Sequence, residues 1–122
     1  MRLQNGTFTI PVLINDKLML DFVLDSGAAD VTIPADVVLT LTRTGTLSDV
    51  DFLETKTYRL ADGRTVPGQT FCIRLLKVGD KILKNVTGSV IPVGGSLLLG
   101  QSFLRRLKSW SIDNERMVLV LE

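Results

Sequence analysis

The sequence predicts a single all-β domain with one short helix near its C-terminal end. Its 122 residues and 45% hydrophobic content fit one globular domain, taken as residues 1–122, with one modest core. Apolar and polar residues alternate in most segments, which is typical of strands that bury one face. Gly, Asn and Asp recur between these segments and indicate turns.

The first predicted element is a β-hairpin. Residues 7–14 alternate, residues 15–17 (Asn-Asp-Lys) supply turn chemistry, and residues 18–24 resume the alternation. The second strand therefore delivers Asp25 at its end, and residues 26–29 follow as a tight loop.

The next segment is less regular. A short strand at residues 31–33 stops at Pro34, and the apolar spacing of residues 37–41 predicts one or two helical turns that end at Gly45. Residues 46–57 are polar with scattered apolar positions, and we interpret them as a loop.

A second hairpin is predicted around Asp62-Gly63, a pair suited to a two-residue type I′ turn. It is flanked by residues 58–61 and 64–69, and Pro67 places the returning strand at a sheet edge. The remaining predicted elements are strands at 71–78 and 82–92, an apolar run at 97–99 that ends at Gly100, a short amphipathic helix at 101–107 marked by apolar residues at 103, 104 and 107, and a hairpin of residues 110–112 and 117–121.

Composition excludes several classes of chemistry. The 14 Lys and Arg against 13 Asp and Glu give a net charge of +1, so no strong field would recruit nucleic acid or an anionic membrane. With no His and one Cys, the chain cannot build a Ser/His or Cys/His pair, and no metal site or cofactor is predicted. We interpret Cys72 as a small buried hydrophobe. Catalysis would therefore depend on carboxylates, lysines or water.

Other charged residues receive structural interpretations. Asp49, Asp51 and Glu54 are expected to be solvated loop charges. Arg105, Arg106 and Lys108 cluster near the C-terminal end of the predicted helix, where cations interact favourably with its dipole; a binding patch is the alternative. No stretch approaches about 18 consecutive apolar residues, so no membrane segment is expected in this chain and the domain is predicted to be soluble.

The tripeptide Asp25-Ser26-Gly27 stands out because an apolar strand precedes it. The strand would fix the carboxylate, Gly27 would allow a tight turn and close backbone approach, and the Ser26 hydroxyl could hold the loop rigid. Alone, however, Asp-Ser-Gly is also common turn composition.

In this context the sequence resembles the retropepsin-like aspartic proteases, the family of retroviral proteases and their bacterial relatives. The segment 22–28 (Phe-Val-Leu-Asp-Ser-Gly-Ala) follows the family's apolar-apolar-Asp-Ser/Thr-Gly-Ala pattern. The hairpin at 61–64 falls where the family carries its flap, and 97–100 followed by a helix matches its apolar-apolar-Gly motif. The final hairpin from Trp110 resembles the terminal segment of the family. The resemblance spans nearly the whole chain and implies a single-lobe closed β-barrel or sandwich with a flap hairpin.

The resemblance also implies roles for residues. Asp25 would be catalytic, and because the chain has one such aspartate, the active site would need a homodimer acting on a peptide or protein substrate. The active-site loop would be supported by Ser26, Gly27, Ala28, Leu99 and Gly100. Substrate would be contacted by Gly27, Asp30, Ala61, Asp62 and Gly63, with a solvated loop acid as the alternative for Asp30.

The chain departs from retroviral members in an ion pair. Those members often carry an Asp at the position of Ala29 and an Arg at that of Gln101, and here both are absent together. Losing both avoids an unpaired charge, and it points towards bacterial-type members. Bacterial members often hang from a membrane anchor ahead of the catalytic domain, so this domain could be the catalytic part of such a protein.

Two other functions compete with the peptidase. One is an aspartic-protease fold that has lost catalysis and serves for dimerisation or peptide binding, because a fold does not fix a function. The other is an unrelated small β-barrel that binds a ligand or nucleic acid, which the balanced charge and few aromatic residues disfavour.

Overall fold

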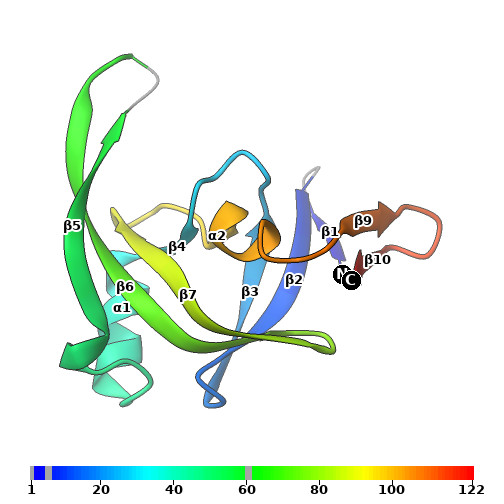
Figure 1. The fold of residues 1–122 in the computed structure, drawn as a ribbon, viewed down its shortest axis with the longest axis horizontal. Coiled ribbons are helices and arrows are strands. Elements are labelled where there is room, and N and C mark those ends of the chain that lie inside the picture. Colours follow the sequence, from blue (N-terminus) through cyan, green and yellow to red (C-terminus); the bar gives the residue numbers. More distant parts are fainter. Residues whose placement is uncertain (1, 5–6, 60–61) are drawn as a thin grey trace.

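The main sheet closes on itself into a ring (Figure 1). In the computed structural model, which describes residues 2–4, 7–59 and 62–122, the sheet has eight strands in the order β1-β2-β3-β8-β4-β7-β6-β5. Pairing of β2 with β6 completes the ring, while β1 and β5 extend beyond it. The predicted all-β class, with a closed barrel-like ring of strands, is therefore confirmed.

The elements have the following bounds. The strands of the main sheet are β1 (Arg2–Gln4), β2 (Thr7–Ile14), β3 (Leu18–Leu24), β4 (Val31–Pro34), β5 (Phe52–Arg59), β6 (Thr65–Val78), β7 (Lys81–Ile91) and β8 (Leu98–Leu99). A separate hairpin near the C-terminus comprises β9 (Trp110–Asp113) and β10 (Val118–Leu121). The helical segments are α1 (Ala35–Arg43), the 3-10 helix η1 (Asp49–Asp51) and α2 (Gln101–Leu104).

The core fills the ring with the apolar residues that the alternation predicts. On β2, Ile10, Val12 and Ile14 are buried, and Phe22 of β3 is fully buried opposite Ile10. Side chains from β4, β6, β7, α1 and α2 complete one continuous cluster. None of the described helices is long and apolar enough to cross a membrane.

The first hairpin forms as predicted. Ile14 pairs with Leu18, and Asn15 and Asp16 take positive φ values of 50° and 58° in the turn. The Asn15 side chain then links the turn to its surroundings, since it donates to the Thr46 carbonyl and accepts from the Leu75 amide. Asn and Asp tolerate this left-handed backbone better than other residues with a side chain.

The segment after β4 differs from its prediction. The helix α1 is longer than the predicted one or two turns, although Gly45 does end it with φ of 77°. The prediction of a loop at residues 46–57 is wrong, because it contains η1 and most of β5. Most of β5 is exposed on both faces, so its sequence carries no alternation, and backbone pairing with β6 defines the strand instead.

The β5–β6 hairpin is longer than predicted, and its turn is different. The strand β6 runs unbroken through 14 residues, and among the described residues the pair nearest the turn is Arg59 with Thr65. A two-residue turn at Asp62-Gly63 would pair Arg59 with Val66 instead, so the type I′ turn is wrong. Gly63 has a positive φ of 89°, whereas Asp62 does not. The edge position of Pro67 is confirmed, because it pairs with Thr57 of β5 while pairing of β6 with β7 begins only at Thr70.

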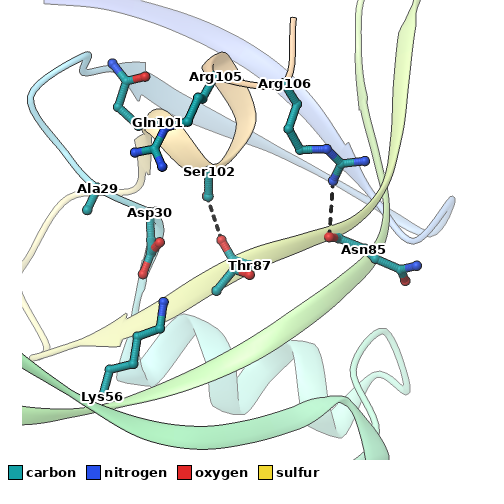
Figure 2. A pocket seen from close by; sticks show the side chains of 9 residues that line it. All are labelled: Ala29, Asp30, Lys56, Asn85, Thr87, Gln101, Ser102, Arg105 and Arg106. Atoms are coloured by element: carbon teal, nitrogen blue, oxygen red, sulfur yellow. Dashed lines mark hydrogen bonds between the residues drawn. The ribbon is translucent and has the colours of Figure 1, made fainter.

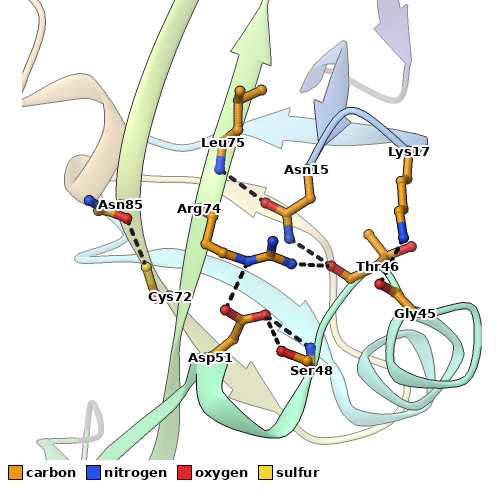
Figure 3. A network of polar contacts seen from close by, with 10 residues as sticks. All are labelled: Asn15, Lys17, Gly45, Thr46, Ser48, Asp51, Cys72, Arg74, Leu75 and Asn85. Atoms are coloured by element: carbon orange, nitrogen blue, oxygen red, sulfur yellow. Dashed lines mark hydrogen bonds and ion pairs between the residues drawn. The ribbon is translucent and has the colours of Figure 1, made fainter.

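Asp51 is buried, which corrects its interpretation as a solvated charge. Only 3% of its surface is exposed, and its carboxylate accepts a bond of 2.9 Å from Arg74 Nε (Figure 3). The other carboxylate oxygen accepts from the Ser48 amide and hydroxyl, which caps η1. Arg74 also donates to the Thr46 carbonyl. This network fixes the chain between α1 and β5, and sequence reasoning missed it because Arg74 lies 23 residues away.

We expect Asp51→Ala to destabilise the fold by about 1–3 kcal/mol, because η1 loses its cap and Arg74 loses its partner while remaining partly solvated. Asp49→Ala, at an exposed position of the same turn, should change the unfolding free energy by less than about 0.5 kcal/mol. Chemical denaturation of both variants provides the measurement. Equal losses in the two variants would show that the buried ion pair does not stabilise this region.

Candidate active site

Asp25 directly follows β3, whose last two residues pair with the short strand β8. The short strand β8 lies between β3 and β4, parallel to β3, with Leu24 opposite Leu99. The Asp25 amide donates to the Leu99 carbonyl at 3.2 Å. Leu99 is fully buried, so β8 anchors the base of the Asp25 loop in the core.

Bonds within the loop orient the Asp25 carboxylate. The Gly27 amide donates to its Oδ1 at 2.9 Å, and the Ala28 amide donates to the Asp25 carbonyl at 3.2 Å. Asp25 is partly exposed, while Ser26 and Gly27 are exposed. The loop therefore presents one oriented carboxylate at the surface.

The start of α2 supports this loop from below. The Gln101 amide donates to the Ala28 carbonyl at 2.8 Å, and the Ser102 amide donates to the Ala29 carbonyl at 2.9 Å. Gly100 makes this approach possible, since a Cβ there would lie 2.3 Å from the Asp30 carbonyl oxygen. Its φ of −105° suits any residue, so the requirement for glycine is steric and not conformational. The helix covers residues 101–104, so it begins where predicted and ends before the predicted residue 107.

The Gln101 side chain also holds the loop. Its Nε2 donates to the Ser26 carbonyl at 2.8 Å. A neutral amide therefore bridges α2 to the loop. The positions where retroviral members often carry an Asp and an Arg hold Ala29 and Gln101 here, so neither position leaves an unpaired charge.

Ser102 and Thr87 were missed by sequence reasoning. The Ser102 hydroxyl donates to the Thr87 carbonyl at 2.7 Å (Figure 2). It also accepts from the Val31 amide at 2.9 Å, so it joins β4, β7 and α2. A serine one position inside a short helix gives no sequence signal of its own. Its partners are 71 and 15 residues away.

Asp30 is buried, so its alternative interpretation as a solvated loop acid is wrong. It is 7% exposed, and its Oδ2 accepts bonds from the Tyr58 hydroxyl at 2.8 Å and the Ser89 hydroxyl at 2.6 Å. The two hydroxyls are themselves 2.6 Å apart. Burial raises the pKa of Tyr58, and the bond to Asp30 raises it further against a lowering contribution from Ser89, so the phenol stays a proton donor.

Tyr58 connects the β5–β6 hairpin to the active-site loop, and Gly68 makes room for it. A Cβ at Gly68 would lie 2.6 Å from the Tyr58 ring. The ring therefore rests on the backbone of β6 while its hydroxyl reaches Asp30. Sequence analysis did not single out Tyr58, although it is the only tyrosine of the chain.

A pocket of about 520 Å³ opens beside this contact. One wall is the loop at residues 28–30, and the opposite wall is the hairpin at residues 66–68. Val90, Ile91 and Pro92 add an apolar side. Asp30 and Tyr58 thus place a polar floor in a largely apolar pocket that begins three residues after Asp25.

The expected substrate contacts at the hairpin tip are only partly described. Asp62 is exposed and pairs with Arg64 at 2.6 Å, and Gly63 is exposed. Ala61 lies outside the described residues. In Figure 1, β5 and β6 extend towards the same side of the molecule as the loop between β3 and β4. The hairpin residues described as lining the pocket are instead Tyr58, Val66, Pro67 and Gly68.

Cys72 is half-buried and not fully buried as expected. Its Sγ lies 3.5 Å from Asn85 Oδ1. Burial raises the pKa of the thiol, with Asp51 adding to the effect. The protonated thiol is a poor nucleophile, and Cys72 lines neither of the pockets that contain Ala29 and Asp30.

We expect Tyr58→Phe to destabilise the protein by about 1–3 kcal/mol, because the Asp30 carboxylate loses a buried donor while the ring still packs on Gly68. A double-mutant cycle with Asp30→Asn, followed by chemical denaturation, measures the coupling. A strongly non-additive result is expected, and additivity would mean that the two groups act independently.

Comparisons with known proteins agree with this geometry. Residues 10–103 match the family model described as aspartyl protease. A solved structure of a retropepsin-like aspartic protease from Rickettsia conorii is similar over 99% of this chain and 93% of that one, with 25% identity and a TM-score of 0.67. A comparison with curated proteins finds no match. The family match covers most of the chain, including Asp25, β8 and most of α2. The chain therefore belongs to the aspartyl protease family and has a retropepsin-like fold.

Proposed function

We propose that this chain is an aspartic endopeptidase in which residues 1–122 form one catalytic unit. The observation that carries the proposal is the Asp25 carboxylate, which is oriented by the Gly27 amide and held at the surface by β8 and α2. Family membership and the adjoining pocket of about 520 Å³ support a peptide as the substrate.

The proposed active site is completed by a second copy of the chain. Acid–base hydrolysis by carboxylates needs a base for the water and an acid for the carbonyl, and the loop provides one carboxylate. An isologous homodimer would bring Asp25 of each copy to the twofold axis. In the single chain Asp25 is partly exposed, which leaves it accessible to a second copy.

In the proposed mechanism, the two carboxylates share one proton and hold a water between them. The ionised carboxylate takes a proton from the water as its oxygen attacks the carbonyl carbon. The protonated carboxylate gives its proton to the carbonyl oxygen. The tetrahedral gem-diol then collapses: one of its hydroxyls gives its proton to the ionised carboxylate as the C=O bond re-forms, the C–N bond breaks, and the leaving nitrogen takes the proton held by the other carboxylate. The pair thus ends with one shared proton, as it began. No covalent enzyme intermediate forms.

Other residues of the site would position the substrate. The Gly27 carbonyl would accept a bond from the peptide backbone, and Asp30 would contribute a polar group to the pocket for a side chain. The β5–β6 hairpin would act as a flap, with Asp62 and Gly63 closing over the peptide and excluding water. Ala61, outside the described residues, is proposed as a further substrate contact from its place in the sequence. Ser26, Ala28, Leu99 and Gly100 would keep the loop rigid.

The Asp25→Asn variant should lose at least about 10²-fold in peptide cleavage, because it can neither share the proton nor act as the base. Asp21→Asn is the matched control, since it removes an exposed carboxylate from the same strand β3 and should leave the rate unchanged. Cleavage of a peptide library, read by mass spectrometry, provides the measurement. A fold that serves only for dimerisation or peptide binding would give the same traces with and without Asp25.

The same variant tests the dimer. When equal amounts of wild-type chain and Asp25→Asn are allowed to exchange subunits, about one quarter of the dimers should retain two aspartates. Activity per wild-type chain should then fall by about half. Molecular mass is determined at the same concentrations. Undiminished activity, or activity in a monomer, would contradict the shared site.

The pH profile of cleavage should show an acidic to mildly acidic optimum. The rate falls at low pH when the pair gains its second proton and loses the base, and it falls at high pH when the pair loses the shared proton and with it the acid. We expect both limbs in kcat/KM measured from about pH 3 to pH 9. Activity that is constant up to pH 9 would exclude a pair with one shared proton.

A further inference from the structure

A second pocket, of about 400 Å³, lies behind the active-site loop (Figure 2). Its walls come from the loop, from β5, from β7 and from the segment of α2 and the residues that follow it. It shares Ala29 and Asp30 with the pocket of about 520 Å³ described above, which we call the first pocket. The two pockets therefore adjoin at the same short stretch of chain.

Cationic side chains dominate the second pocket. Lys56, Arg105 and Arg106 line it, and Asp30 is its one acidic residue. The whole chain carries a net charge of only +1, so this concentration of cations is local. Among the described residues, the ion pairs involve other arginines, and no carboxylate pairs with any of these three.

The cations are held in place to different degrees. Arg106 Nη1 donates to the Lys84 carbonyl at 2.7 Å and to the Asn85 carbonyl at 3.1 Å, so its guanidinium is fixed at one wall. Lys56 and Arg105 are exposed and can adjust, and Figure 2 shows Lys56 pointing from β5 towards Asp30. The bond between Ser102 and Thr87 fixes the floor.

Asp30 does not cancel these charges through an ion pair. Its Oδ2 is occupied by the Tyr58 and Ser89 hydroxyls, which face the first pocket. With three cations and one carboxylate, the second pocket is cationic. An anion could bind these cations without displacing a carboxylate from an existing ion pair.

We propose that the second pocket binds an acidic side chain of the peptide substrate, at a position beyond the residue that fills the first pocket. The proposal rests on the peptidase function above. The two pockets adjoin, because both are lined by Ala29 and Asp30. An extended peptide with one side chain in the first pocket would therefore bring a neighbouring part of its chain to the second. This continuity favours a substrate carboxylate over a free anion.

The test compares peptides that differ only in one residue. A cleavable peptide is scanned with Glu and Gln at each position on both sides of the scissile bond, and kcat/KM is measured with the wild-type protein. We expect one position where Glu is preferred about fivefold, the range of a partly exposed ion pair. In a twofold dimer the preference recurs at the equivalent position on the other side. It should shrink in 0.5 M salt, where charges are screened within about 4 Å.

Substitutions assign the preference to this pocket. Lys56→Gln and Arg105→Gln should each reduce it, and Arg105→Glu should shift it towards Lys at the same position. Lys77→Gln removes an exposed cation of β6 outside the pocket and should leave the preference unchanged. Arg106 is left intact because it bonds to the backbone of β7.

The outcomes separate the two proposals. Cleavage without a Glu preference, or with a preference that survives Lys56→Gln and Arg105→Gln, overturns the acidic subsite while the peptidase stands. If no peptide is cleaved, the peptidase fails, and binding of fluorescent Glu and Gln peptides to Asp25→Asn decides the subsite. Equal binding overturns it, and tighter binding of the Glu peptide that depends on Arg105 supports it. Binding of inorganic phosphate that depends on Arg105, without discrimination between peptides, also overturns it.

Discussion

The close contact between Gly100 and the loop after β3 is the constraint on which the site depends. No side chain separates the start of α2 from the carbonyls of Ala28 and Asp30, so two backbone segments from distant parts of the sequence touch directly. The amides of Gln101 and Ser102 then satisfy carbonyls of the loop. Without this contact, the Asp25 loop would lose the two backbone bonds that hold it on α2, and the direction of its carboxylate would be less firmly fixed.

A buried polar contact links this loop to the β5–β6 hairpin and to β7. The Asp30 carboxylate is out of water, and it is tolerated there because Tyr58 and Ser89 donate to it. These donors belong to the hairpin and to β7. The loop, the hairpin and the barrel wall are therefore joined through one oxygen atom, and the shape of the pocket depends on all three together.

Local patterns predicted the parts of the fold that depend on near neighbours. The alternation in residues 7–24 gave the first hairpin, and the apolar run before Gly100 gave the strand beside Asp25. The burial of polar residues was harder to predict. Asp30 and Asp51 look like surface acids in sequence, and they are buried because partners from remote strands meet them. The first six residues of β5, 52–57, were missed for a related reason, since an exposed edge strand has no apolar face to reveal it.

Closure of the ring by β2 and β6 has a consequence for how the chain behaves among other proteins. A strand at an open edge displays unpaired amides and carbonyls, which invite pairing with foreign chains. In the main sheet the closure leaves β1 and β5 at the ends of the order. The long edge, β5, carries Glu54, Lys56 and Arg59, and such charges oppose the addition of another strand. The charged, exposed character that hid β5 in the sequence is thus a protection against aggregation.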